Sequence, residues 1–83
     1  MRIRKKERGT RNIIGERVEM ARRSQGIRQK VLLDKLHDSG VDITGASLSK
    51  LEGQVRGALD YELLALADAL NVSVNWLLGR EES

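Results

Sequence analysis

The stretch Ile43–Gly57 reads ITGASLSKLEGQVRG and combines helical spacing with small polar side chains. Thr44 is a favoured residue for capping a helix N-terminus, and Leu48 and Leu51 are spaced to share one face of the helix that follows. This pattern predicts a short helix from Gly45 to about Gly53. Its leading turn consists of glycine, alanine and serine, which is poor material for a core helix and requires another explanation.

Upstream of this stretch the sequence predicts two more helices. Asn12 is a plausible N-cap for the first, and Gly26 suits the left-handed residue that ends it. The second helix begins at about Gln29 and ends at Gly40. Together with the helix at 45–53 it could form a helix-turn-helix. The residues expected to face the core are Ile14, Val18, Ala21, Leu32, Leu33 and Leu36.

Downstream the sequence predicts a loop and two further helices. After the loop Gln54–Leu59, Asp60 is expected to cap a fourth helix that Asn71 ends. Ser73 is expected to cap a short fifth helix that stops at Gly79. The core candidates here are Leu63, Leu64, Ala67, Leu70, Trp76, Leu77 and Leu78. The chain is therefore expected to be all-α.

The chain of 83 residues is expected to form one domain with an uneven charge distribution. We expect a basic flexible arm at 1–11, a five-helix unit at 12–80 and a frayed tail at 81–83. Residues 1–30 hold eleven Lys/Arg and three Glu, whereas residues 31–83 hold four Lys/Arg and nine Asp/Glu. This asymmetry indicates a polyanionic partner on one side of the molecule, and a solvated basic tail is the alternative reading of the charge alone.

Composition argues against several classes of site. The chain has no cysteine and one histidine, His37, so no disulfide, thiolate centre or metal site is expected. No apolar run approaches the length of a membrane span and no signal peptide is recognisable, so we expect a cytoplasmic protein without a membrane partner. His37, Asp60, Glu62 and Asp68 are expected to be solvated surface residues. No catalytic constellation is present, so neither enzymatic activity nor a cofactor is expected.

Five segments in order resemble the lambdoid phage repressor and Cro class, or XRE type, of helix-turn-helix regulators. They are IGERV at 14–18, AR at 21–22, GIRQ at 26–29, LSKLE at 48–52 and ALNVSVNWLL at 69–78. The resemblance implies a compact five-helix domain whose third helix enters the DNA major groove with its first turn at the base edges. A groove about 12 Å wide requires short side chains there, which would explain glycine, alanine and serine at 45–47.

Carried over by position, the resemblance implies a set of DNA contacts. Gly45 and Ala46 offer no side-chain hydrogen bond, so base readout falls to Ser47 and Lys50, with methyl contact from Ala46 to thymine as an addition. Lys50 could instead contact a phosphate or be solvated. For Gln29, the resemblance implies contact with a phosphate or with the residue that reads the first base. The full set of expected DNA-binding residues is Arg28, Gln29, Thr44, Gly45, Ala46, Ser47, Lys50 and Arg56.

The resemblance also implies a structural feature, and the sequence departs from the class in two places. Arg22 and Glu52 are expected to form a largely buried ion pair between the first and third helices. The connector Asp38–Thr44 is longer than the usual tight turn, and Leu33 stands where the class prefers a small residue. These two departures agree, because a wider gap between helices needs a longer turn.

The implied function is sequence-specific binding of double-stranded DNA by a transcriptional regulator, most simply a repressor that binds two half-sites as a homodimer. Leu77 and Leu78 could form the dimer contact or lie in the core. The alternative is an antitoxin-like or anti-repressor module that binds another protein and for which DNA is secondary. The basic arm is expected to contact the DNA backbone or to be a solvated tail, and its cations are Arg2, Arg4, Lys5, Lys6, Arg8 and Arg11.

Overall fold

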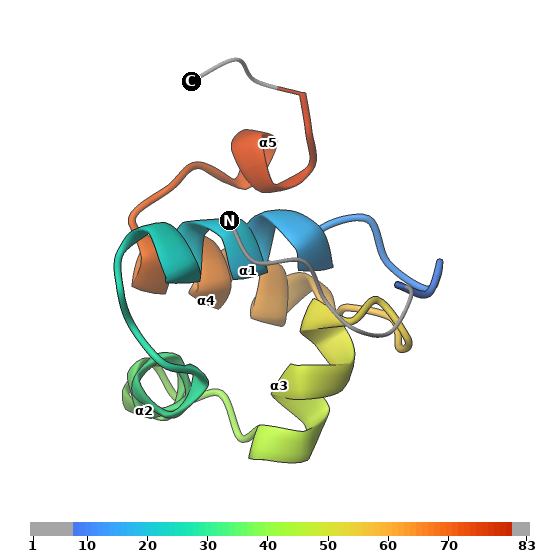
Figure 1. Cartoon of the computed structure of the whole chain (residues 1–83). Helices are drawn as coiled ribbons and strands as arrows, with labels where there is room; N and C mark the ends of the chain where they lie inside the picture. The colour runs from blue at the N-terminus through green and yellow to red at the C-terminus, as the bar shows by residue number, and fades with distance from the viewer. Residues whose placement is uncertain (1–7, 81–83) are drawn as a thin grey trace.

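Helices account for all the regular structure of residues 8–80, the part of the chain that the computed structural model describes (Figure 1). In chain order they are α1 (Gly15–Ser24), α2 (Gln29–Asp38), α3 (Gly45–Glu52), α4 (Asp60–Leu70) and α5 (Val74–Leu77). The all-α, five-helix prediction is therefore confirmed. The predicted tail at 81–83 and residues 1–7 of the predicted arm lie outside the described residues.

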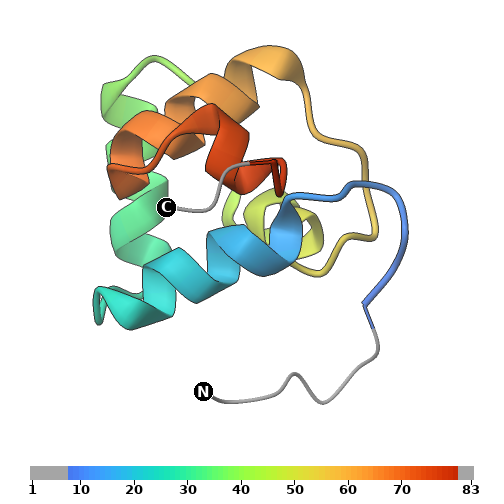
Figure 2. The same cartoon turned by 90° about the horizontal axis from the view of Figure 1, so that it is seen from above.

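The helices are arranged around the pair α1 and α4, which pack against each other. α5 rests on both of them from one side, whereas α2 and α3 lie on the opposite side (Figures 1 and 2). α2 contacts α3 and α4, and α3 contacts α1. The helix-turn-helix pair α2–α3 therefore sits on a support formed by α1 and α4.

Side-chain oxygens bind N–H groups at three helix starts, and at two of these, Thr44 and Ser73, the predicted residue occupies the cap position. The Thr44 hydroxyl accepts a hydrogen bond from the Ser47 N–H at 3.0 Å, and the Ser73 hydroxyl accepts one from the Trp76 N–H at 2.9 Å. The cap position of α1 is occupied by Ile14, not by the predicted Asn12, but Asn12 Oδ1 accepts from the N–H groups of residues 14 and 15 at 3.0 and 2.8 Å. Each bond satisfies a donor that the helix itself leaves unpaired.

The predicted cap at Asp60 is wrong, because Asp60 is the first residue of α4 and Leu59 occupies the cap position. The carboxylate of Glu62 reaches back and accepts the Leu59 N–H at 3.0 Å. One donor at this helix start is thus satisfied by the third helical residue, as in half of a capping box. Sequence alone favours the aspartate because it is the better cap residue.

The ends of α1 and α4 follow the predicted turn chemistry. Gly26 has φ 71° after α1, and its N–H donates to the Arg23 carbonyl at 3.0 Å, while the Ile27 N–H donates to the Arg22 carbonyl at 3.2 Å. This pair of bonds is a Schellman motif. Asn71 ends α4 in the left-handed region with φ 58°.

The core contains most of the apolar residues predicted to be buried, and the prediction is wrong at one position of α4. Leu64 is 58% exposed, whereas Leu66, at 1% exposed, takes the inward position on α4. α4 packs on α1 and α2 through the face that carries Leu66 and Leu70. Leu64 lies on another face of α4 and is directed to solvent. Four predicted core residues are only partly buried against the core, namely Leu33, Leu63, Trp76 and Leu78.

Residues 8–11 lie against the C-terminal end of α3, although the sequence places them in the flexible arm. The Gly9 N–H donates to the Gly53 carbonyl at 2.8 Å, and the Arg11 N–H donates to the Gln54 carbonyl at 2.9 Å. A side chain at position 9 would overlap the Gln54 carbonyl oxygen, so this approach requires glycine. Residues 9–11 are therefore docked on the domain, because these N–H groups satisfy carbonyls that the end of α3 leaves open.

Candidate nucleic-acid interface

The leading turn of α3 is exposed while the rest of the helix is anchored. Leu48 and Leu51 are fully buried, whereas Gly45, Ala46 and Lys50 are exposed. A Cβ placed on Gly45 would find the Leu33 side chain at 3.8 Å, which is an ordinary contact. Packing within the protein therefore does not require glycine at the start of α3. The absence of a side chain there leaves room for a partner that approaches α3 from outside.

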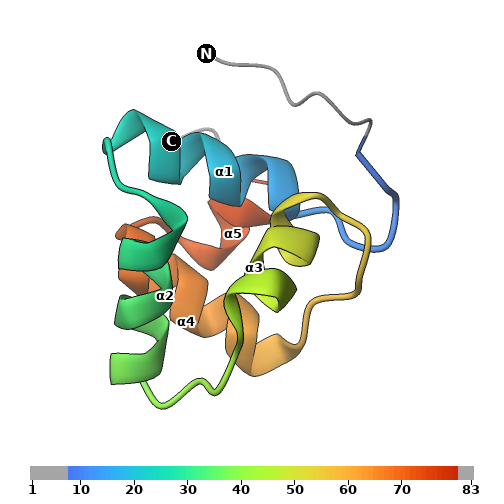
Figure 3. The same cartoon turned by 60° about the horizontal axis from the view of Figure 1, so that its bottom comes forward.

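The long connector between α2 and α3 is anchored at two points. Val41 and Ile43 are buried in the core, and Nε2 of His37 donates to the Ile43 carbonyl at 2.7 Å. His37 itself is exposed, as predicted. The bond joins the last turn of α2 to the residue before Thr44, so the length of the connector does not separate α2 from α3 (Figure 3).

The predicted ion pair between Arg22 and Glu52 is present and buried. Arg22 Nε donates to Glu52 Oε2 at 2.8 Å and a terminal nitrogen of Arg22 donates to Oε1 at 3.0 Å, a bidentate arrangement. Glu52 is fully buried and Arg22 is 7% exposed. Arg22 also donates to the Ile27 carbonyl at 3.0 Å. The pair therefore fixes α3 to α1 and to the turn that precedes α2.

The start of α2 presents donors to the outside. The backbone N–H groups of Gln29 and Lys30 have no acceptor in the described chain, and Arg28, at the cap position, supplies no capping bond. The side chains of Arg28 and Lys30 are exposed, and Gln29 is half-buried. Open N–H groups at a helix N-terminus beside two cations favour an anion such as a phosphate.

The guanidinium of Arg56 is engaged inside the protein. It donates to the Ser47 carbonyl at 3.0 Å and the Gly57 carbonyl at 2.8 Å, and it pairs with Glu62 at 2.9 Å. Glu62 is 6% exposed, so the prediction that it is solvated is wrong. Arg56 holds the loop after α3 to α3 itself, and its expected DNA contact stays a prediction.

Opposing influences set the pKa of the Glu62 carboxyl. Burial raises this pKa, whereas the hydrogen bonds from Arg56 and from the Leu59 N–H, together with the Arg56 charge, lower it. The lowering is larger, so the pKa lies below its usual value. Glu62 is therefore held as a carboxylate that joins the loop to α4.

A second cluster of charges was not predicted from the sequence. Glu19 is 3% exposed and pairs with Arg8 and with Arg23, whose Nε lies 3.0 Å from Glu19 Oε2. Arg8 also donates to the backbone carbonyl of Glu52. The spacing of Glu19 and Arg23 by four residues was a visible signal for a pair on one helix face. The contact of Arg8 with Glu19 depends on the docking of residues 8–11 and had no such signal.

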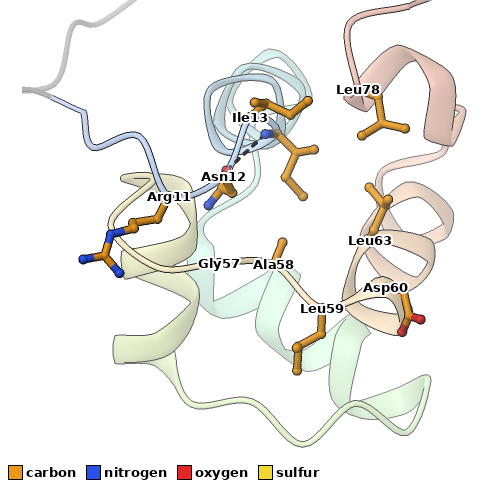
Figure 4. Close-up of a pocket in the computed structure, with 10 residues that line it drawn as sticks. Arg11, Asn12, Ile13, Gly57, Ala58, Leu59, Asp60, Leu63 and Leu78 are labelled. Carbon is orange, nitrogen blue, oxygen red and sulfur yellow. Dashed lines mark hydrogen bonds between the residues drawn. The ribbon is translucent and has the colours of Figure 1, made fainter.

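An apolar groove lies between the N-terminal segment, the loop after α3, α4 and the end of α5. Its volume is about 450 Å³. Ile13, Leu63 and Leu78 surround it, and Leu59 lies at its edge with its side chain directed away from the other three (Figure 4). Ile13 is 68% exposed and Leu59 is 49% exposed. Leu77 is fully buried in the core, so of the two leucines considered for a dimer contact only Leu78 lines the groove.

Residues 8–80 contain neither a metal-binding cluster nor a membrane-spanning helix. No group of three His, Asp or Glu side chains in this range could hold a metal ion. None of the five helices is long and apolar enough to cross a membrane.

Comparison with known proteins gives one structural similarity. No protein-family model matches the chain, and no curated protein matches its sequence. Among solved structures, the chain is similar to the P22 c2 repressor protein in complex with synthetic operator 9T in the presence of Tl⁺. The TM-score is 0.68 and the sequence identity is 30%, over 83% of this chain and 97% of that chain. The five-helix arrangement is thus shared with a repressor crystallised on its operator.

Proposed function

The chain belongs to the lambdoid phage repressor class of helix-turn-helix proteins, and from that premise we propose that it is a sequence-specific repressor of transcription that reads double-stranded DNA with α3. The exposed leading turn of α3 is the observation that carries this proposal. Gly45 and Ala46 are exposed, and Gly45 has space for a side chain that the protein does not supply. A helix turn with such small side chains can approach the base edges in the major groove closely.

Three groups of residues divide the proposed contacts with DNA. Ser47 and Lys50 read base edges, and the Ala46 methyl group meets a thymine methyl. Arg28, Gln29 and the open N–H groups at the start of α2 hold a backbone phosphate. Arg28 and Lys50 are both exposed, so both cations are accessible to DNA. In this division, phosphate contacts fix the register of the protein on DNA and base contacts supply its specificity.

We propose that two copies of the chain bind DNA together and meet through the groove formed by Ile13, Leu59, Leu63 and Leu78. Ile13 and Leu59 are large apolar side chains that are about half exposed or more. A two-fold dimer brings the same patch of each copy into contact and covers these side chains. The substitution Ile13→Glu should give a monomer by sedimentation, whereas Leu64→Glu, outside the groove, should leave a dimer. The reverse result would move the contact to the outer face of α4.

A repressor of this kind needs neither a cofactor nor a catalytic group, and we propose none. We propose that it acts in the cytoplasm, where it would have access to chromosomal DNA. The alternative function, a module that binds another protein, predicts that DNA binding is weak, salt-sensitive and indifferent to sequence.

Selection of bound duplexes from a random pool tests the proposed function. We expect enrichment of duplexes with two related half-sites about one helical turn apart. Ala46→Glu should abolish enrichment, because its carboxylate would enter the groove, whereas Asn75→Glu on α5 adds the same charge on the opposite side and should not. A folded protein that enriches no duplex would reject the proposal and favour the protein-binding alternative.

A further inference from the structure

The carboxylate of Glu52 has a partner beyond its ion pair. Oε1 of Glu52 accepts a hydrogen bond from Nε2 of Gln29 at 2.9 Å in addition to the bond from Arg22 at 3.0 Å. Glu52 is the last residue of α3 and Gln29 is the first residue of α2. One fully buried carboxylate therefore joins α1, α3 and the start of α2.

The hydrogen bond from Gln29 to Glu52 was not predicted from the sequence. A glutamine at this position was expected to reach a phosphate or the residue that reads the first base. Its amide nitrogen binds Glu52 at the C-terminal end of α3. An amide nitrogen carries two hydrogens, so the bond to Glu52 leaves one of them for another acceptor. Gln29 is half-buried, which leaves part of its side chain open to solvent.

We propose that Glu52 is a positioning residue for DNA binding, whose buried carboxylate holds the Gln29 amide so that its second N–H donates to a phosphodiester of the DNA backbone. The backbone N–H groups of Gln29 and Lys30, which lack acceptors in the described chain, would face the same phosphate. This inference rests on the proposed function and deepens it, because it names the group that orients one of the phosphate contacts.

The physical advantage lies in orientation. A free glutamine side chain loses rotamer freedom when it binds a ligand, whereas a side chain already held at one N–H loses less. Glu52 is itself fixed by two bonds from Arg22. The N-terminal end of α2 is therefore held at a fixed position relative to α3. As a result, α2 can bind a phosphate while α3 enters the major groove, and no conformational change is needed.

The experiment compares two backgrounds that lack the ion pair but differ in the acceptor. The amide background, Arg22→Met with Glu52→Gln, keeps an oxygen that can accept from Gln29. The thioether background, Arg22→Met with Glu52→Met, removes it. Neither background leaves a buried unpaired charge. Gln29→Ala is added to each background and to the native chain. The measurements are the Kd for one selected duplex over a salt series and urea unfolding followed by the fluorescence of Trp76.

Gln29→Ala should weaken binding roughly tenfold in the native chain and in the amide background, as expected for a lost hydrogen bond to a charged group. In the thioether background the Kd should change less than about twofold, because Gln29 is no longer held there. The salt slope should stay the same, since a neutral amide releases no counterion. Gln25→Ala is the matched control: its amide donates to the Leu70 carbonyl, and its loss should not alter the Kd.

An equal loss in both backgrounds would show that Gln29 acts without Glu52 and would overturn the inference. If a background fails to fold, Gln29→Asn in the native chain decides the matter. Its amide is one methylene too short to reach Glu52 and a phosphate together, so it should bind as weakly as Gln29→Ala. Native affinity for that variant would also overturn the inference. A native chain that selects no duplex would reject the proposed function itself, so the two failures are distinguishable.

Discussion

At the scale of single residues, each buried glutamate of residues 8–80 is paired with an arginine from another turn or segment. Glu19 pairs with Arg8 and Arg23, Glu52 with Arg22, and Glu62 with Arg56. The Glu52 pair could be predicted because the resemblance supplied both partners. The pairs made by Arg8 and Arg56 could not, since each depends on how a non-helical segment folds back on the domain.

Removal of Glu52 alone should destabilise the fold strongly, because Arg22 would be left buried without its carboxylate. We expect Glu52→Ala to lower the free energy of unfolding by about 3–5 kcal/mol. Replacement of both residues by methionine should cost much less, since no charge then remains in the core. Urea unfolding of Glu52→Ala, Arg22→Met and the double methionine variant measures this. Small additive losses, each well below about 1 kcal/mol, would show that the pair is not buried in solution.

The pH dependence of stability should report the carboxylate of Glu62. Its pKa in the folded chain lies below the usual value, so the unfolded chain takes up its proton at a higher pH. The stabilisation is therefore complete above about pH 4.3, the ordinary glutamate pKa, and is lost as the pH falls through the lower folded pKa. The native chain should lose more stability than Glu62→Gln between neutral pH and about pH 3, as measured by urea unfolding. Identical pH profiles would contradict this prediction.

At the scale of the helices, the caps at Thr44 and Ser73 and the left-handed ends at Gly26 and Asn71 were predictable, because they use local chemistry. The caps predicted at Asn12 and Asp60 were misplaced by two residues and one residue. The inward face of α4 was not predictable, since DYELLALADAL is apolar on several faces and its period does not separate Leu64 from Leu66. The sequence also placed α3 and its exposed leading turn correctly. The hydrogen bond from Gln29 to Glu52 was not foreseen, because it depends on where the fold places the end of α3.

Lys50 tests whether α3 reads bases or only meets phosphates. If its ammonium meets a guanine edge, Lys50→Ala should weaken binding to the selected duplex by about 1–3 kcal/mol and have little effect on a scrambled duplex. If it meets a phosphate, both duplexes should bind more weakly, and the salt slope should fall by about one unit. Lys35→Ala on α2 is a control for the loss of one exposed cation. No change in affinity or slope would remove Lys50 from the interface.

At the scale of the whole molecule, residues 8–11 of the predicted basic arm are packed against the helical domain. Arg8 contacts Glu19 and the carbonyl of Glu52, and Gly9 approaches the turn after α3 too closely for a side chain. The other four cations of the predicted N-terminal half of the arm, Arg2, Arg4, Lys5 and Lys6, lie outside the described residues. A chain that starts at Asn12 would lose these contacts as well as the charges, so deletion confuses stability with DNA binding.

Neutralising Arg2, Arg4, Lys5 and Lys6 to glutamine separates the two effects, because Arg8 and Gly9 stay in place. We expect an unchanged preferred sequence, and urea unfolding measures any effect of the four substitutions on stability. The slope of log affinity against log salt should become shallower by about 0.9 for each phosphate contact that is lost. Binding of a selected and a scrambled duplex over a salt series measures both quantities.

Arg8→Gln is the complementary variant, and it should lower stability because Glu19 loses a partner. An unchanged slope in the fourfold variant would identify the arm as a solvated tail. A lost sequence preference with intact unfolding would make the arm a base reader, and would require part of the specificity now proposed for α3 to be assigned to residues 2–6.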